Sequence, residues 1–341
     1  MSEMTRAASA KVRLSRSPAW SKSPVAPTIV VVIVLAIIPL VWRNDYVISL
    51  FTLILLYSLM TQSWNLTIGM CGIWNLGQLA IIAVGGYATG ILTIKLGMSA
   101  WLALPVGVAA GGLTALIIVL PIIRLRGIFA ALLTFAFAEV VRRLIVVDNT
   151  GLTGGLFGLS GVKGLFDALS SSWSLRAYFW LTLVLSAAVM LLAYRMAREP
   201  FGAGHDRRSK PIVAILISGL VAGLAGGLYA TFYHGITPSF MGLGPTGLLL
   251  IMIVVGGLGT VRGPILGAFV VTILSEVLRD TVVWRLLGLG ALLVLVLAFW
   301  PGGIDGLLTR SLARIGSWMS AGQGEGEDRA EPGAPKGGKK T

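Results

Sequence analysis

Apolar segments of about membrane-spanning length recur along most of this sequence, separated by short polar or glycine-rich stretches. A helix needs about 20 mostly apolar residues to cross the hydrocarbon core of a bilayer, and fewer where neighbouring helices bury it. The pattern therefore predicts an all-α, polytopic transmembrane bundle of about ten helices, with totals of eight or nine left open. The predicted spans are residues 25–42, 46–66, 72–94, 98–120, 127–147, 175–195, 211–233, 246–259, 264–278 and 284–300.

The two ends of the chain differ from this apolar region. Residues 1–24 are polar and basic, and the end of the chain becomes rich in glycine, glutamate and lysine. The first apolar run ends in Trp42 and Arg43 rather than in a small-residue cleavage site, so we expect a retained span. We expect a basic N-terminal segment over 1–24, a transmembrane domain over 25–300 and a largely disordered tail over 301–341.

The distribution of Lys and Arg predicts the orientation of the chain. Basic residues are enriched in cytoplasmic loops, near the ends of the spans. Most of the 27 Lys and Arg fall in 1–24, 124–126, 195–210, Arg262 and the tail. These segments, and both termini, are therefore expected in the cytoplasm, and residues 150–170 are expected outside.

Composition excludes the main soluble classes of protein. Hydrophobic residues make up 56% of the 341 and charged residues 12%, against about a quarter charged in a soluble domain. A net charge of +13 would suggest nucleic acid in a soluble protein, but here it is explained by loops that face anionic lipid. No phosphate-binding G-x-x-x-x-G-K-[ST] motif occurs, and one Cys and two His favour no metal. We expect no cofactor and no nucleic acid.

Glycine is unusually frequent, with 44 residues, about twice the average share. Many glycines lie four residues apart inside apolar spans, as at Gly107/Gly111 and Gly219/Gly223. Small residues on one helical face allow close packing of membrane helices, so the sequence predicts a tight bundle. The segments 81–86 and 252–257 are also alike, which fits two inverted repeats and equally fits chance.

Polar residues inside apolar spans are candidates for a solute pathway, because polar groups are costly to bury in lipid. Asn75 and Gln78 interrupt the passage from the second to the third span, where helix ends could contact a polar solute; a simple interfacial turn is the alternative. Glu139 stands one turn before Arg143, which also fits a structural ion pair. The candidates are Asn75, Gln78, Thr134, Glu139 and Thr153.

Two other functions remain open on these residues alone. Glu139 is the best carboxylate for a stand-alone ion-coupled carrier or channel. The segment Gly158–Gly161 matches the G-x-S-G of rhomboid-type intramembrane serine proteases, with Ser160 as nucleophile and His234 as base. That motif stands in a glycine-rich stretch typical of a loop, which argues against the protease.

Five blocks in order along the chain resemble the permeases of branched-chain amino-acid ABC importers. The blocks are Gly69–Gln78 with Gly85-Gly86-Tyr87, Leu125–Glu139, Thr153–Gly161, Ser218–Tyr229 and Val255–Ala268. The N-terminal half is similar to the larger of the two permeases in such a system. The resemblance implies a bacterial inner-membrane subunit for branched-chain amino acids or related solutes such as urea and short amides. It implies a second permease, separate ATP-binding subunits and a periplasmic solute-binding protein as partners, with no enzymatic activity on this chain.

The chain departs from this family at one cytoplasmic loop. Family members carry a coupling helix after a segment like Arg198–Gly202, whereas here only residues 203–210 precede Pro211. The element that docks the ATPase therefore looks reduced. The basic residues that could contact it are Arg207, Arg208, Arg124 and Arg262.

Overall fold

The computed structural model describes most of the chain between residues 44 and 307. The described residues are 44–70, 72–122, 125, 127–198, 209–279, 281–300 and 302–307, with Ala36, Ile37 and Pro39. The predicted segment 1–24 and almost all of the first span and the tail lie outside them.

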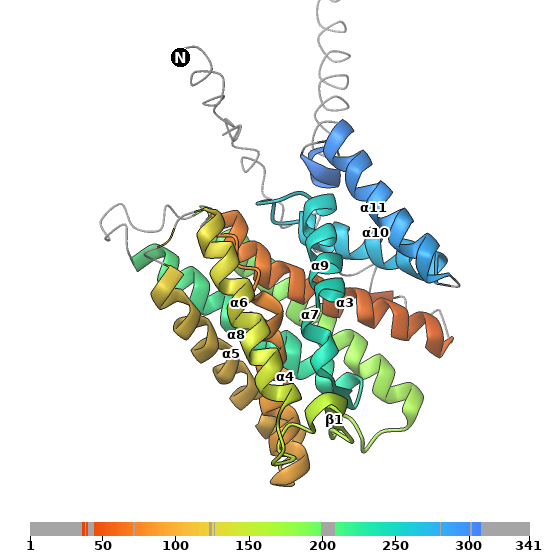
Figure 1. The fold of residues 1–341 in the computed structure, drawn as a ribbon. Coiled ribbons are helices and arrows are strands. Elements are labelled where there is room, and N and C mark those ends of the chain that lie inside the picture. The colour runs from red at the N-terminus through yellow and green to blue at the C-terminus, as the bar shows by residue number, and fades with distance from the viewer. Residues whose placement is uncertain are drawn as a thin grey trace, which may run out of the picture.

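Nine long helices make up most of the described chain (Figure 1). They are α3 (Asp45–Asn65), α4 (Gln78–Lys95), α5 (Ala100–Ile122), α6 (Ile128–Val146), α7 (Ser171–Arg198), α8 (Ser209–Phe232), α9 (Leu243–Gly256), α10 (Gly263–Val277) and α11 (Val282–Phe299). Short elements join them: η1 (Leu66–Met70), η2 (Gly155–Phe157), η3 (Pro238–Met241), β1 (Leu159–Ser160) and β2 (Gly235–Ile236). The prediction of an all-α bundle is confirmed, and each span from the second to the tenth corresponds to one helix.

Six of the described helices are long and apolar enough to cross a membrane, and α9 and α10 are shorter apolar helices. The chain is therefore a multi-pass membrane protein. The third predicted span begins later than expected, because residues 72–77 are not helical. The π-helix η1 ends α3 just before this stretch, so the prediction of an interrupted passage between these spans is confirmed.

Contacts between helix ends divide the loops into two groups. In one group β1 pairs with β2, and the Lys163 ammonium donates to the Gly97 carbonyl at 3.3 Å. In the other group Asn65 at the end of α3 bonds Thr260, between α9 and α10. Segments predicted on the same side of the membrane thus meet one another, as the ten-span alternation requires. Which side is cytoplasmic stays a prediction from the basic residues.

Helices α4, α5 and α8 pack through glycine. A Cβ atom placed on Gly85 would lie 2.5 Å from the Gly223 Cα atom, and one placed on Gly111 would lie 2.6 Å from the Gly219 carbonyl oxygen. Both distances are far below van der Waals contact, so the backbones themselves touch. The predicted tight packing at the spaced glycines is confirmed.

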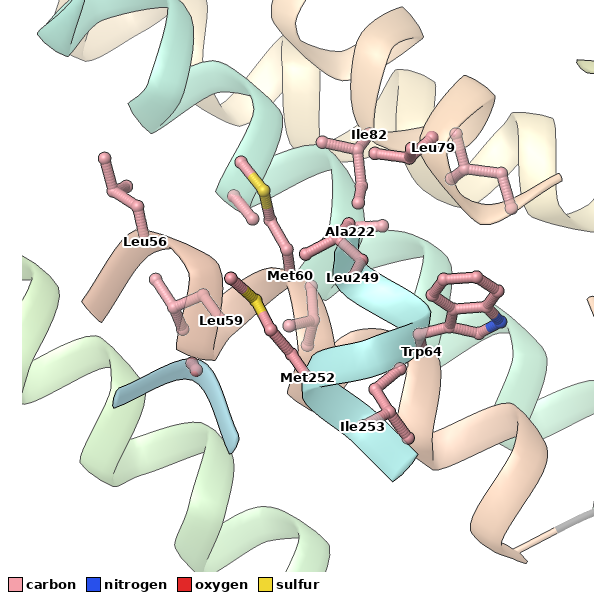
Figure 2. Packing of buried hydrophobic residues seen from close by; sticks show 14 of the residues in the cluster. Leu56, Leu59, Met60, Trp64, Leu79, Ile82, Ala222, Leu249, Met252 and Ile253 are labelled. Carbon is pink, nitrogen blue, oxygen red and sulfur yellow. The ribbon is translucent and has the colours of Figure 1, made fainter. Parts of the chain in front are cut away.

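Helix α3 lies on the other side of α8 and packs against α7, α8 and α10. Its inner face joins α8 and α9 in the main hydrophobic cluster (Figure 2). The fully or almost fully buried members labelled there are Leu56, Leu59, Met60, Trp64, Leu79, Ile82, Ala222, Leu249, Met252 and Ile253. This apolar packing frames the polar residues described next.

Candidate functional site: a buried polar cluster

Five polar side chains form a hydrogen-bonded group where α3, α4, α6 and α8 meet, named here the polar cluster. Its members are Ser63, Asn75, Gln78, Thr134 and Ser218, each at most 2% exposed. Three of the five residues proposed from the sequence for the pathway, Asn75, Gln78 and Thr134, are therefore brought together. The sequence analysis missed the two serines.

Gln78, the first residue of α4, lies at the centre of the polar cluster. Its amide nitrogen donates to the hydroxyls of Ser63 and Ser218, each at 3.1 Å. Its amide oxygen accepts from the Asn75 side chain at 3.0 Å, and the Ser218 hydroxyl donates to the Ser63 carbonyl at 2.6 Å. One side chain of α4 thus ties this helix to α3 and α8 at once.

Asn75 and Thr134 hold the non-helical segment that precedes α4. The Asn75 amide oxygen accepts from the Gly77 N–H at 3.0 Å. The Thr134 hydroxyl accepts from the Leu76 N–H at 3.0 Å and donates to the Ala131 carbonyl at 2.9 Å. These bonds satisfy backbone groups that the break leaves without helical partners, which a membrane interior requires.

The last turns of α3 carry further buried polar contacts. The Gln62 amide nitrogen donates to Ser58 and to Ser186 of α7, each at 2.9 Å. The buried Gln62 amide oxygen has no hydrogen-bond partner within the described part of the chain. The Asn65 side chain donates to the Thr260 carbonyl at 2.8 Å and accepts from the Gly259 N–H at 3.0 Å.

The polar side chains of α3 had a signal in the sequence. Residues 61–65, Thr-Gln-Ser-Trp-Asn, form a polar run inside an otherwise apolar span. Ser186 and Ser218 had none, because a single serine in an apolar helix also bonds its own backbone.

Glu139 lies on the outward side of α6, apart from the polar cluster. Its carboxylate accepts from Arg143 Nε at 2.9 Å, which confirms the predicted pair. Arg142 adds two bonds, at 2.8 and 2.6 Å. The Glu139 side chain is 36% exposed, so these bonds account for its charge without a solute.

Thr153 belongs to the loop that follows α6. Its N–H and hydroxyl donate to Asp148 Oδ2 at 2.6 and 2.7 Å, and Thr150 bonds the other carboxylate oxygen twice. These hydrogen bonds hold the pKa of Asp148 well below its ordinary value, the Thr150 hydroxyl contributing most. The residue thus shapes a turn, and its role in a pathway stays a prediction.

The residues proposed for ATPase coupling fall mostly outside the described chain. Arg124, Arg207 and Arg208 lie there, as does most of the 203–210 loop. Arg262 is half-buried at the start of α10, where its carbonyl accepts from the N–H groups of Ile265 and Leu266, each at 3.2 Å.

The two protease candidates lie on neighbouring strands without forming a dyad. Ser160 pairs with Gly235, next to His234. His234 Nδ1 lies 3.0 Å from the Val162 carbonyl, and no described hydrogen bond joins the imidazole to Ser160. A serine nucleophile needs its base within hydrogen-bond reach.

Comparison with known proteins assigns a family. A family model described as "Branched-chain amino acid transport system / permease component" matches residues 46–297. Its range takes in every long helix except the first residue of α3 and the end of α11.

Two curated relatives carry the same printed name, "High-affinity branched-chain amino acid transport system permease protein LivM". The protein from Escherichia coli (strain K12) is 26% identical over 291 residues, covering 74% of this chain and 68% of its own. The protein from Salmonella typhimurium (strain LT2) is 25% identical over 314 residues, covering 81% and 72%. No solved structure matches the chain.

Proposed function

Because the chain belongs to the branched-chain amino acid transport system permease family, we propose that it carries such an amino acid, or a related small polar solute, across a bacterial inner membrane. The chain is a permease component, and members of this family are transport proteins. The family match over residues 46–297 carries the assignment, and the multi-pass helical fold agrees with it.

The proposed importer needs partners that this chain does not supply. ATP is hydrolysed on separate ATP-binding subunits, a second permease completes the pathway, and a periplasmic binding protein delivers the solute. Both termini lie in the cytoplasm, since the basic residues concentrate on that side. Arg262 and the region of Arg124 then lie on the face that meets the ATPase, together with the short 203–210 loop.

The polar cluster is proposed as the part of the chain that responds to the solute and nucleotide states. Its bonds link the helix break before α4 to three other helices. An import cycle shifts populations between states that bind the loaded partner and nucleotide differently. Hydroxyl and amide groups can exchange partners in such a shift at small cost, whereas close backbone packing cannot.

The test is uptake of labelled leucine by cells that lack their own branched-chain transport and express this chain with its neighbouring transport genes. We expect uptake that disappears when the ATPase subunit cannot hydrolyse ATP. Urea and acetamide as competitors distinguish the related solutes. Uptake that survives ATPase inactivation but stops on collapse of the proton gradient would contradict the proposal and favour an ion-coupled carrier.

A further inference from the structure

One face of α6 is uncovered and is apolar apart from its charges. Its residues follow helical spacing, and Leu132, Val140 and Leu144 are 57%, 55% and 69% exposed. The opposite face, with Ala130, Thr134, Ala138 and Ile145, is buried. Through that face α6 packs on α4 and α5 and, at one end, on η2 and η3. Helix α6 therefore lies at the edge of the bundle, with its exposed stripe facing outward (Figure 1).

Charged side chains lie on or beside this exposed stripe. Arg143 is 72% exposed, Glu139 36% and Arg142 29%. Glu139 stands seven residues before the end of α6 at Val146, which is about 10 Å along the helix axis. In the other described helices every Asp, Glu, Lys and Arg lies within five residues of a helix end. Helix α6 thus exposes charge deeper than any other described helix.

The charges on α6 are not neutralised within the described chain. The Glu139 carboxylate is shared by Arg142 and Arg143, so the three side chains carry a net charge of about +1. Arg143 donates only through Nε in the described hydrogen bonds, while a guanidinium has five N–H donors. Facing acyl chains, these donors would be without acceptors, which is costly in a membrane. The surface fits a protein that supplies acceptors.

Other described parts of the chain lie elsewhere. The Ala36 carbonyl accepts from Trp180 of α7 at 3.3 Å, which places the residues before α3 beside α7. Helix α11 packs on α9 and α10. By contrast, the exposed stripe of α11 is wholly apolar, with Val294 65% and Leu295 50% exposed. The face of α11 suits lipid, and the face of α6 does not.

We infer that the exposed face of α6 binds the second permease subunit, and that this partner presents carboxylate or carbonyl oxygens to Arg143. The inference rests on the proposed function, which requires a paired permease. A lipid-facing surface would have no need for the charges, and a water-facing one would have no need for the apolar stripe. A protein partner inside the membrane satisfies both.

The test uses a photo-cross-linking amino acid, p-benzoylphenylalanine, in place of Val140 in the full transporter expressed from its own gene cluster. Val294 on α11 is the matched control, since both valines are exposed and lie about twelve residues into their helices. We expect Val140 to cross-link to the second permease, identified by mass spectrometry, and Val294 to yield no protein adduct. A product with a second copy of this chain, an intramolecular product or no protein product at Val140 would overturn the inference.

A second variant tests the role of the charge. Arg143→Leu is expected to lower the second permease recovered with this chain at least tenfold, while Arg143→Lys recovers most of it. The amount of folded monomer, measured by size-exclusion chromatography, should be unchanged in both. Equal recovery of the partner with Arg143→Leu would contradict the interface. Leucine uptake by the unmodified transporter, measured in parallel, separates the two proposals: cross-linking without uptake removes the substrate assignment alone, and uptake without cross-linking removes the interface alone.

Discussion

Helices α4, α5 and α8 meet through bare backbone, whereas α3 meets its neighbours through polar side chains as well as apolar packing. In the first region a single added methyl group has no space, as at Gly85 against Gly223. In the second region hydroxyl and amide groups of α3 bond α4, α7, α8 and the loop before α10. The comparison indicates one rigid group of three helices and one helix whose contacts can be exchanged.

The two regions join at the polar cluster. Gln78 belongs to the rigid group, yet one of its hydrogen bonds crosses to Ser63 on α3. A helix that shifts against the rigid group would have to break that bond first. The position of the polar cluster, next to the non-helical residues 72–77, allows such a shift because helix breaks take up changes in backbone angle.

The largest expected effect is on the glycine region. A Cβ atom on Gly223 would lie 2.6 Å from the Gly107 carbonyl oxygen, so Gly223→Ala must push α5 and α8 apart. We expect a loss of about 1–3 kcal/mol in stability, typical of overpacking, measured by thermal unfolding in detergent. Gly290→Ala is the control, because nothing lies within 4 Å of its added Cβ atom. Equal stability of the two variants would refute the rigid-group account.

The next effect concerns the joint between the regions. Gln78→Met keeps the volume but removes every hydrogen bond of the amide. Side-chain hydrogen bonds between membrane helices contribute about 0.6 kcal/mol on average, so we expect a stability loss of about 1–2 kcal/mol. Leucine uptake should fall at least tenfold at unchanged expression. Gln62→Met is the control on the α3–α7 side, and loss of uptake in proportion to stability in both variants would reduce Gln78 to a structural residue.

A smaller effect is expected at the contact between α3 and the loop before α10. Asn65→Ala removes the two hydrogen bonds to Gly259 and Thr260. We expect a loss of about 1 kcal/mol in stability and faster hydrogen exchange over residues 257–262. No change in exchange there would show that the close contact of Gly69 with Gly259 holds the loop alone.

The smallest effect lies outside both regions, in the loop after α6. The pKa of Asp148 is lower in the folded chain than in the unfolded one, because Thr150 and Thr153 donate to the carboxylate. The stabilisation is therefore complete above the unfolded pKa of about 4 and is lost as the pH falls through the folded value. Asp148→Asn should speed proteolysis of the loop at pH 7. A loop equally resistant with Asn at pH 7 would show that the hydrogen bonds, and not the charge, hold it.

The bundle and part of the polar cluster could be predicted from the sequence. Each apolar span must form a helix because its backbone has no water to bond, and a break containing Asn75 and Gln78 is visible as polar letters in an apolar run. Ser63 and Ser218 could not be predicted as partners, since they are 155 residues apart and only the fold brings them together. Glu139 and Arg143 were predictable as a pair because their spacing on one helix is local.

The central claim, that α3 moves against a rigid group of α4, α5 and α8, can be measured directly. Spin labels at exposed helix ends, in a Cys71→Ala background, report the separation of Ser99 from Tyr233 (α5 to α8) and of Asn44 from Tyr233 (α3 to α8). The distances are compared by double electron–electron resonance in the full transporter, with and without ATP. The account predicts an unchanged α5–α8 distance and a changed α3–α8 distance. A change in α5–α8, or no change in α3–α8, would contradict it.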